Sequence, residues 1–230
     1  MISHFHKCVF VHIPKTAGIS IEKKILESLD VKYENRMPFW LGPNNNLNIG
    51  PPRFAHLSYD DMIKYHYLSN EIVEKYYKFS IVRHPLDRLR SIYNYKGYNY
   101  LCSFNDFVIK AVPRLVEENW FFQSQVHFIR NSMGQIPMDF IGKFENLEND
   151  FQIISEKIGL SDKKLPHYNK AKKKVTLISK QIKLARLYKS DKKSFNLLSL
   201  NRSNIDITDT VKNCVYKAYR EDFKMFDYNL

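Results

Sequence analysis

The segment VFVHIPKTAGISIEKKIL, residues 9–26, limits the possible folds more than any other part of the sequence. Residues 8–13, which overlap the start of this segment, are apolar, β-branched and aromatic. Such a run is typical of a strand buried on both faces of a parallel sheet. From Gly18 the apolar residues recur at helical spacing, and Glu22, Lys23 and Glu27 are expected on the opposite, polar side of the helix. Because the N–H groups at a helix N-terminus attract anions, a strand, loop and helix in this order predict a phosphate-like ligand.

The loop HIPKTAGIS, residues 12–20, carries side chains that suit an anion. Lys15 adds a positive charge, Thr16 and Ser20 add hydroxyl donors, and Gly18 lets the backbone approach a ligand closely. The Walker loop GxxxxGK[ST] uses the same physics, but its first glycine and its Gly-Lys pair are absent here. An ATP or GTP site with Mg²⁺ is therefore disfavoured, and a structural turn with a surface lysine is the alternative interpretation.

Further strands and helices alternate along the chain. The segments 76–83 and 139–145 are predicted strands, and helices are predicted after Pro85, over 147–158 and after a capping Thr208. Asp60 and Asp61 are expected to cap another helix. We therefore predict one domain over 1–230 with a three-layer, P-loop-like α/β fold, in which helices flank a mostly parallel central sheet.

A second basic motif follows the predicted strand 76–83. In IVRHPLDRLRSIYNY, residues 81–95, Arg83 stands at the carboxyl end of the strand, where open α/β sheets bind their ligands. Ser91 lies about one and a half turns into the next helix. An arginine fork and a serine hydroxyl suit a dianionic phosphate, whereas an Arg–Asp87 pair on a helix surface is the alternative.

The net charge of +12 is concentrated in one segment. Residues 157–193 contain 13 Lys or Arg against Asp162 and Asp191, an excess of +11. Such a stretch is either a solvated surface or a site for a polyanion, namely nucleic acid, an acidic glycan, a phosphorylated cofactor or a membrane surface. The apolar runs are shorter than the roughly 18 residues of a membrane span, and the three separated cysteines are typical of free thiols in a reducing compartment.

Together, HIPKTAG and RHPLDRLRSIY resemble the motifs of the sulfotransferases that use 3′-phosphoadenosine 5′-phosphosulfate (PAPS), especially the bacterial-type carbohydrate O-sulfotransferases of the heparan and chondroitin kind. The resemblance implies that Lys15, Thr16, Ala17, Gly18, Ile19 and Ser20 hold the 5′-phosphosulfate, and that Arg83 and Ser91 hold the 3′-phosphate. It extends to 139–151 and 219–228, and it implies that 165–174 lies near the nucleotide. The product would be adenosine 3′,5′-bisphosphate, and no metal is expected.

The resemblance also implies roles for Lys15 and a histidine in catalysis. Lys15 would neutralise charge on the leaving phosphate. Of the eight histidines, His56 resembles the family's general base, although Ala55 replaces the usual preceding glycine. An ordinary histidine pKa near 6.5 would suit that role. His12, within the first predicted strand, is expected to be a core residue instead.

The main prediction is therefore an in-line sulfuryl transfer to a hydroxyl of a carbohydrate, which is acidic or lipid-linked, with peripheral membrane contact as a further possibility. No nucleic-acid partner is expected, and the expected location is cytoplasmic, or the Golgi lumen if an N-terminal anchor has been removed. A small ATP-dependent P-loop kinase is one alternative. A non-catalytic polyanion-binding module is the other, but it leaves the order Lys15, His56, Arg83 and Ser91 unexplained.

Overall fold

The computed structural model describes residues 1–162, 164–165, 176–198 and 207–230, and the chain divides into two compact units. The sheet unit comprises Met1–Arg83 and Gln125–Asn169, and the helical unit comprises His84–Ser124 and Lys170–Leu230. Each unit is described by itself. The single domain over 1–230 stays a prediction.

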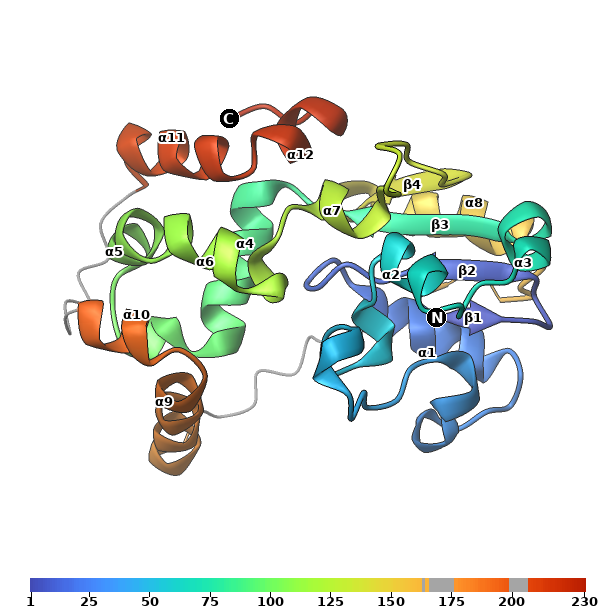
Figure 1. Cartoon of the computed structure of the whole chain (residues 1–230), viewed down its shortest axis with the longest axis horizontal. Helices are drawn as coiled ribbons and strands as arrows, with labels where there is room; N and C mark the ends of the chain where they lie inside the picture. The colour runs from blue at the N-terminus through green and yellow to red at the C-terminus, as the bar shows by residue number, and fades with distance from the viewer. Residues whose placement is uncertain (163, 166–175, 199–206) are drawn as a thin grey trace. The chain divides into compact units, whose positions relative to one another are not determined.

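The sheet unit is built on a mostly parallel sheet, which has four strands in the described part of the chain, in the order β1-β2-β3-β4 (Figure 1). β1 (Ile2–Ser3) pairs antiparallel with β2 (Cys8–Val11), whereas β2 is parallel to β3 (Tyr77–Val82), and β3 to β4 (Phe140–Lys143). The predicted α/β fold is confirmed. β1 is not predicted from the sequence because two residues are too few to show a periodicity.

Helices and short turns complete the sheet unit. Its α-helices in the described residues are α1 (Gly18–Glu27), α2 (Tyr59–Lys64), α3 (Asn70–Lys75), α7 (Gln125–Ile129) and α8 (Leu147–Lys157). Its 3₁₀ turns there are Tyr33–Asn35, Met37–Phe39, Leu47–Ile49, Phe54–His56 and Phe144–Asn146. Four of these turns lie between α1 and α2, and Ser58 caps α2 in a capping box with Asp61, so the expected Asp60 cap is wrong.

One core cluster joins the sheet to α1 and α8. Phe10 of β2 and Phe79 of β3 stack with ring centroids 5.0 Å apart, and Ile21 and Ile25 of α1 and Phe151 of α8 belong to the same buried cluster. The four residues of β2 are all buried, as are five of the six residues of β3. β2 and β3 are thus buried on both faces, as predicted for β2, which makes them a rigid support.

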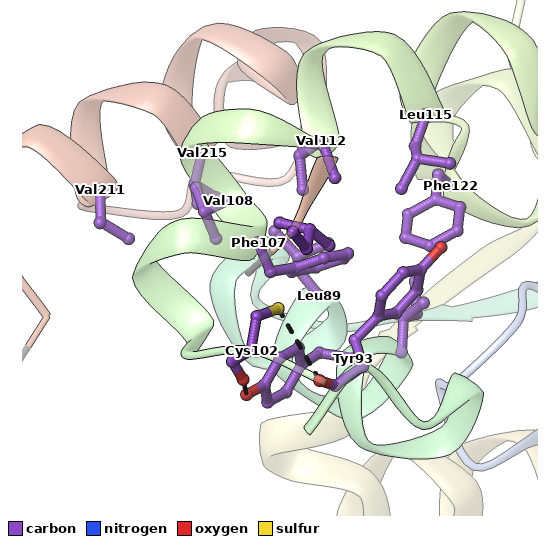
Figure 2. Packing of buried hydrophobic residues seen from close by; sticks show 14 of the residues in the cluster. Leu89, Tyr93, Cys102, Phe107, Val108, Val112, Leu115, Phe122, Val211 and Val215 are labelled. Atoms are coloured by element: carbon purple, nitrogen blue, oxygen red, sulfur yellow. Dashed lines mark hydrogen bonds between the residues drawn. The ribbon is translucent and has the colours of Figure 1, made fainter. Parts of the chain in front are cut away.

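The helical unit contains the remaining described helices. These are α4 (Pro85–Lys96), α5 (Phe104–Lys110), α6 (Val112–Glu118), α9 (Leu177–Ser190), α10 (Lys192–Leu197), α11 (Asp209–Ala218) and α12 (Arg220–Met225), with 3₁₀ turns at Tyr98–Tyr100 and Trp120–Phe122. Its core is aromatic and aliphatic, with Leu89, Phe107, Leu115 and Val215 fully or almost fully buried (Figure 2). Thr208 accepts a hydrogen bond from the Val211 N–H, which confirms the predicted cap of α11.

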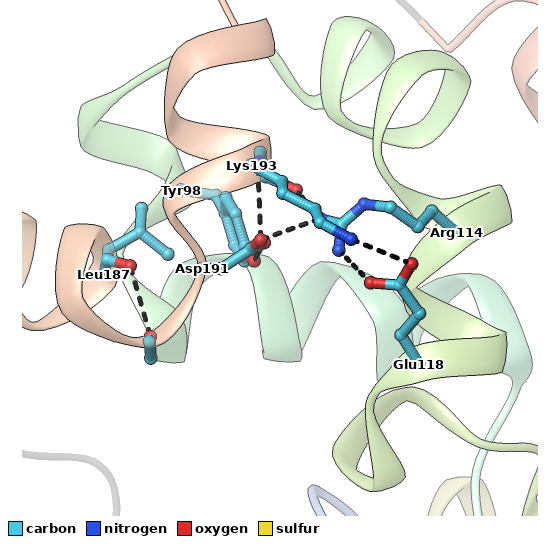
Figure 3. A network of polar contacts seen from close by, with 8 residues as sticks. Tyr98, Arg114, Glu118, Leu187, Asp191 and Lys193 are labelled. Carbon is cyan, nitrogen blue, oxygen red and sulfur yellow. Dashed lines mark hydrogen bonds and ion pairs between the residues drawn. The ribbon is translucent and has the colours of Figure 1, made fainter.

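A polar network fixes the junction of α9 and α10 within the helical unit (Figure 3). The Tyr98 hydroxyl donates to Asp191 Oδ2 at 2.6 Å, and Arg114 Nη2 donates to Asp191 Oδ1 at 2.7 Å while Nη1 donates to Glu118 at 2.6 Å. Burial alone would raise the pKa of Asp191, but hydrogen bonds from Ser194, Tyr98 and Arg114 hold that pKa below its usual value. The ionised carboxylate therefore anchors the end of α9.

No helix in the described part of the chain has both the length and the apolar character needed to cross a lipid bilayer.

Candidate active site

The carboxyl ends of β2, β3 and β4 meet at one edge of the sheet. Val11 of β2 is in register with Ser80, and Val82 of β3 is in register with Lys143, so the loop after β2 and Arg83 after β3 start from the same edge. Ligands of open α/β sheets bind beyond this edge. Lys15 and Arg83, which come from separate motifs, are thus placed at one side of the sheet unit.

Two non-glycine residues of the loop after β2 have left-handed backbone conformations. Lys15 has φ 72° and Ala17 has φ 70°. Each such residue costs roughly 1 to 3 kcal/mol and is typically found where strain serves a function. Left-handed residues in a tight turn direct neighbouring backbone N–H groups toward a common point, where they bind anions. Ala17 is also the N-cap of α1, and no side chain caps that helix.

The other predicted residues of this loop have different surroundings. Thr16 is fully buried, and its hydroxyl donates to the Ile13 carbonyl at 2.9 Å, so its side chain stabilises the loop and its contact with an anion would come from its backbone N–H. Ser20 is buried and Ile19 is exposed. A Cβ atom on Gly18 would lie 2.1 Å from His12 Cδ2, so the loop requires glycine where the imidazole packs against it.

A buried contact between a histidine and a carboxylate connects the end of β2 to α1. His12 Nδ1 and Glu22 Oε1 are 2.5 Å apart, and both side chains are almost completely buried. Glu22 is therefore not on a solvated face, and the prediction from its helical position is wrong. Burial is the largest single influence and raises the pKa of Glu22, but the charge of His12, the hydrogen bond with His12 and the charges of the N-terminus and Arg53 together hold that pKa below its ordinary value. Tyr33 donates to Glu22 Oε2 at 3.3 Å and accepts from Arg53 at 3.2 Å, which extends the network.

His56 lies against His12, at the end of the turn Phe54–His56. The two ring centroids are 4.4 Å apart, and His56 Nδ1 is 3.1 Å from the His12 carbonyl oxygen. Because a carbonyl oxygen only accepts, Nδ1 carries the proton of the neutral ring and Nε2 is the basic nitrogen. Burial and then the charge of His12 lower the pKa of His56 to about 3, so the ordinary value near 6.5 predicted for this residue is wrong.

Gln125 of α7 fixes the backbone at Arg83. Its Oε1 accepts from the Arg83 N–H at 2.8 Å, and its Nε2 donates to the Arg83 carbonyl at 2.8 Å, so a fully buried amide side chain extends β3 by one residue. The guanidinium carbon lies 4.1 Å from the centroid of the Phe144 ring, and Nη1 is 3.5 Å from the Lys15 carbonyl oxygen. Sequence reasoning missed Gln125 because it is 42 residues away from Arg83 and carries no local motif.

The remaining predicted residues belong to other parts of the chain. Ser91 lies half-buried on α4, in the helical unit, and α4 begins at Pro85 as predicted. Arg88 of the same helix is buried and donates to the carbonyls of Gln123 and Phe121 at 2.9 and 3.3 Å, so its role is structural. The segment 165–174, apart from Leu165, is outside the described residues.

An α/β sheet with a strained loop between a central strand and a helix is the arrangement of P-loop-like folds, in which anions typically bind at the helix N-terminus. A family model for the sulfotransferase family matches residues 1–229, and the chain therefore belongs to that family, whose members are transferases of sulfuryl groups. No curated protein and no solved structure matched the chain.

Proposed function

We propose that the protein transfers the sulfuryl group of PAPS to a hydroxyl group of a carbohydrate. The observation that supports this most is the pair of left-handed residues Lys15 and Ala17 in the uncapped loop before α1. A loop that holds such strain without a glycine at either position suits a doubly charged ester, whose binding energy offsets the strain. The loop therefore fits the 5′-phosphosulfate.

The proposed donor site uses Lys15 and Arg83 for different charges. PAPS, when bound, supplies the sulfuryl group and leaves as adenosine 3′,5′-bisphosphate. Lys15 would stabilise the negative charge that develops on the leaving phosphate, and removal of a preorganised donor of this kind costs about a hundredfold or more in rate. Arg83 and Ser91 would hold the 3′-phosphate. The scheme uses no metal ion.

His56 would take the proton of the acceptor hydroxyl at Nε2. With a pKa of about 3, its ring is neutral at physiological pH and ready to accept a proton, although it is a weak base. Negative charge nearby favours the imidazolium form and raises the pKa of a histidine. Donor binding at the loop next to His12 would therefore strengthen the base, which couples proton transfer to the presence of PAPS.

An aromatic cluster beside His56 supports a carbohydrate acceptor. Trp40 lies 5.5 Å from Phe54 and 4.3 Å from Tyr67 between ring centroids, and all three side chains are partly exposed. Phe54 is in the same 3₁₀ turn as His56. The face of an aromatic ring carries partial negative charge and attracts partially positive groups. The C–H bonds of a sugar ring are groups of this kind.

Calorimetric titration tests the donor site. We expect tight binding of adenosine 3′,5′-bisphosphate and weak binding of AMP and of ATP, with or without Mg²⁺. Arg83→Ala should remove the preference for the 3′-phosphate, whereas Lys64→Ala, an exposed lysine of α2, should not change it. Equal affinity of the wild-type protein for AMP and the bisphosphate would refute the donor assignment.

A sulfate-transfer assay with a panel of oligosaccharides tests the base and the acceptor class. His56→Ala should retain bisphosphate affinity while turnover falls at least about a hundredfold. Trp40→Ala should raise the KM for the sugar and leave donor affinity unchanged. Unchanged turnover in His56→Ala would assign the base to another residue, and transfer only to non-sugar hydroxyls would refute a carbohydrate acceptor.

A further inference from the structure

Helix α9 combines strong positive charge with exposed apolar side chains. Its sequence, LISKQIKLARLYKS, contains four basic residues and no acidic residue. Ile178 is 69% exposed and Ile182 is 46% exposed, and Leu177 just before them is exposed as well. An ordinary surface helix buries its aliphatic residues and exposes polar ones, so aliphatic residues on the outside need a separate explanation.

The inner face of α9 is defined by its contacts within the helical unit. Leu187 is buried in the core of this unit, and Leu184 packs against that core. The Lys180 and Lys183 ammonium groups lie 5.9 and 5.4 Å from the centroid of the Tyr100 ring. Together with the Asp191 network at the end of the helix, shown in Figure 3, these contacts fix the rotation of α9 about its axis.

The opposite face is therefore directed away from the core. Positions 178, 182, 185 and 189 follow the i, i+4, i+7, i+11 spacing of one helix face. Ile178, Ile182 and Ala185 form an apolar stripe there, and the exposed Lys189 and Arg186 lie on and beside it. We call Ile178, Ile182, Arg186 and Lys189 the outer face of α9.

We propose that the outer face of α9 docks the protein onto a lipid bilayer with anionic head groups. A basic helix with an apolar stripe lies in the bilayer interface, where its aliphatic side chains enter the acyl boundary and its cations remain at the head groups. Charge complementarity supports this partner, since basic residues near an anionic membrane are attracted to its surface potential. The inference is independent of the proposed acceptor and donor.

The isoleucines favour a bilayer over a soluble polyanion. A sulfated or carboxylated glycan is bound by Lys and Arg, and Ile178 and Ile182 would contribute little to that contact. Stable binding to a bilayer needs both apolar side chains and positive charges, because charge alone gives weak binding that salt abolishes. A variant that removes only the apolar component therefore separates the two partners.

Co-sedimentation of the full chain with vesicles tests the proposal. We expect binding to phosphatidylcholine vesicles that contain about 30% phosphatidylglycerol and little binding to pure phosphatidylcholine. Ile178→Ser/Ile182→Ser should reduce the partition coefficient about tenfold or more, because serine does not enter the acyl boundary. The same double variant should elute from immobilised heparin at the salt concentration of the wild type.

A charge-matched pair of variants provides the control. Arg186→Gln/Lys189→Gln should reduce vesicle binding about tenfold or more, whereas Lys217→Gln/Lys224→Gln, which removes two exposed charges elsewhere in the helical unit, should change it less than about twofold. Circular dichroism should show that all variants remain folded. Three results would each overturn the proposal: no binding to the anionic vesicles, full vesicle binding by Ile178→Ser/Ile182→Ser, or equal losses in the two charge variants.

Discussion

The buried His56 predicts a specific loss of stability in acid. The pKa of His56 is about 3 in the folded chain, against about 6.5 for an ordinary histidine in an unfolded chain. Because the folded-state pKa is the lower one, the unfolded chain binds the proton preferentially as the pH falls from about 6.5 toward about 3. This one group should therefore lower the free energy of unfolding by about 2 kcal/mol between about pH 7.5 and about pH 5.

The assay is urea unfolding at the two pH values, followed by a fluorophore in the sheet unit. Trp40 lies beside Phe54, two residues from His56, so a Trp120→Phe background leaves a tryptophan that reports on this region. His56→Asn removes the titrating group and keeps a side-chain donor for the His12 carbonyl. The variant should lose about 2 kcal/mol less than its parent between the two pH values.

A histidine on the same unit supplies the matched control. His66→Asn changes an exposed histidine at a left-handed position that asparagine tolerates well, and we expect it to follow the pH dependence of the parent. The compared quantity is the change in unfolding free energy between the two pH values. The cost of the cavity that each substitution leaves does not depend on pH and therefore cancels. If His56→Asn and its parent lost stability equally in acid, the lowered pKa of His56, and with it the account of a base strengthened by donor binding, would be refuted.

Further predictions concern the loop and its support. Gly18→Ala should cost about 1 to 3 kcal/mol in unfolding free energy, because its methyl group would meet the His12 ring; an unchanged urea midpoint would contradict this contact. Ala17→Gly should increase stability by about 1 kcal/mol, since glycine adopts φ 70° without strain, and a loss of stability would argue against a strained loop. Gln125→Met should weaken binding of adenosine 3′,5′-bisphosphate about tenfold in calorimetry through the displaced backbone of Arg83, and full affinity would show that this amide does not position the site.

Much of the fold is predictable because it depends on local periodicity and on caps. β2 and β3 are marked by continuous apolar runs, and Thr208 and Pro85 begin their helices as predicted. Ser58 and Asp61 form a capping box whose Ser-x-x-Asp spacing is visible in the sequence. Signals of this kind span a few residues, so no tertiary information is needed to read them.

The surroundings of the candidate site depend instead on contacts between distant segments. The helical spacing of Glu22 places it with polar residues, but its burial is decided by its pairing with His12, which follows β2. The lowered pKa of His56 has the same origin, since it requires the turn Phe54–His56 to pack against that histidine. Gln125 contacts Arg83 only because α7 lies at the end of β3. No period or cap encodes such pairings.

The buried pair of His12 and Glu22 has a consequence for the way this sequence can change over generations. Loss of either partner would leave an uncompensated buried group at a cost of about 3 to 5 kcal/mol, whereas replacement of both by apolar residues of similar volume would be nearly neutral. Natural selection should therefore remove single substitutions at these two positions. Related sequences that differ there should have both residues replaced together. Such joint exchange would also release the residue at position 18 from being glycine, because the ring that excludes a Cβ atom there would be gone.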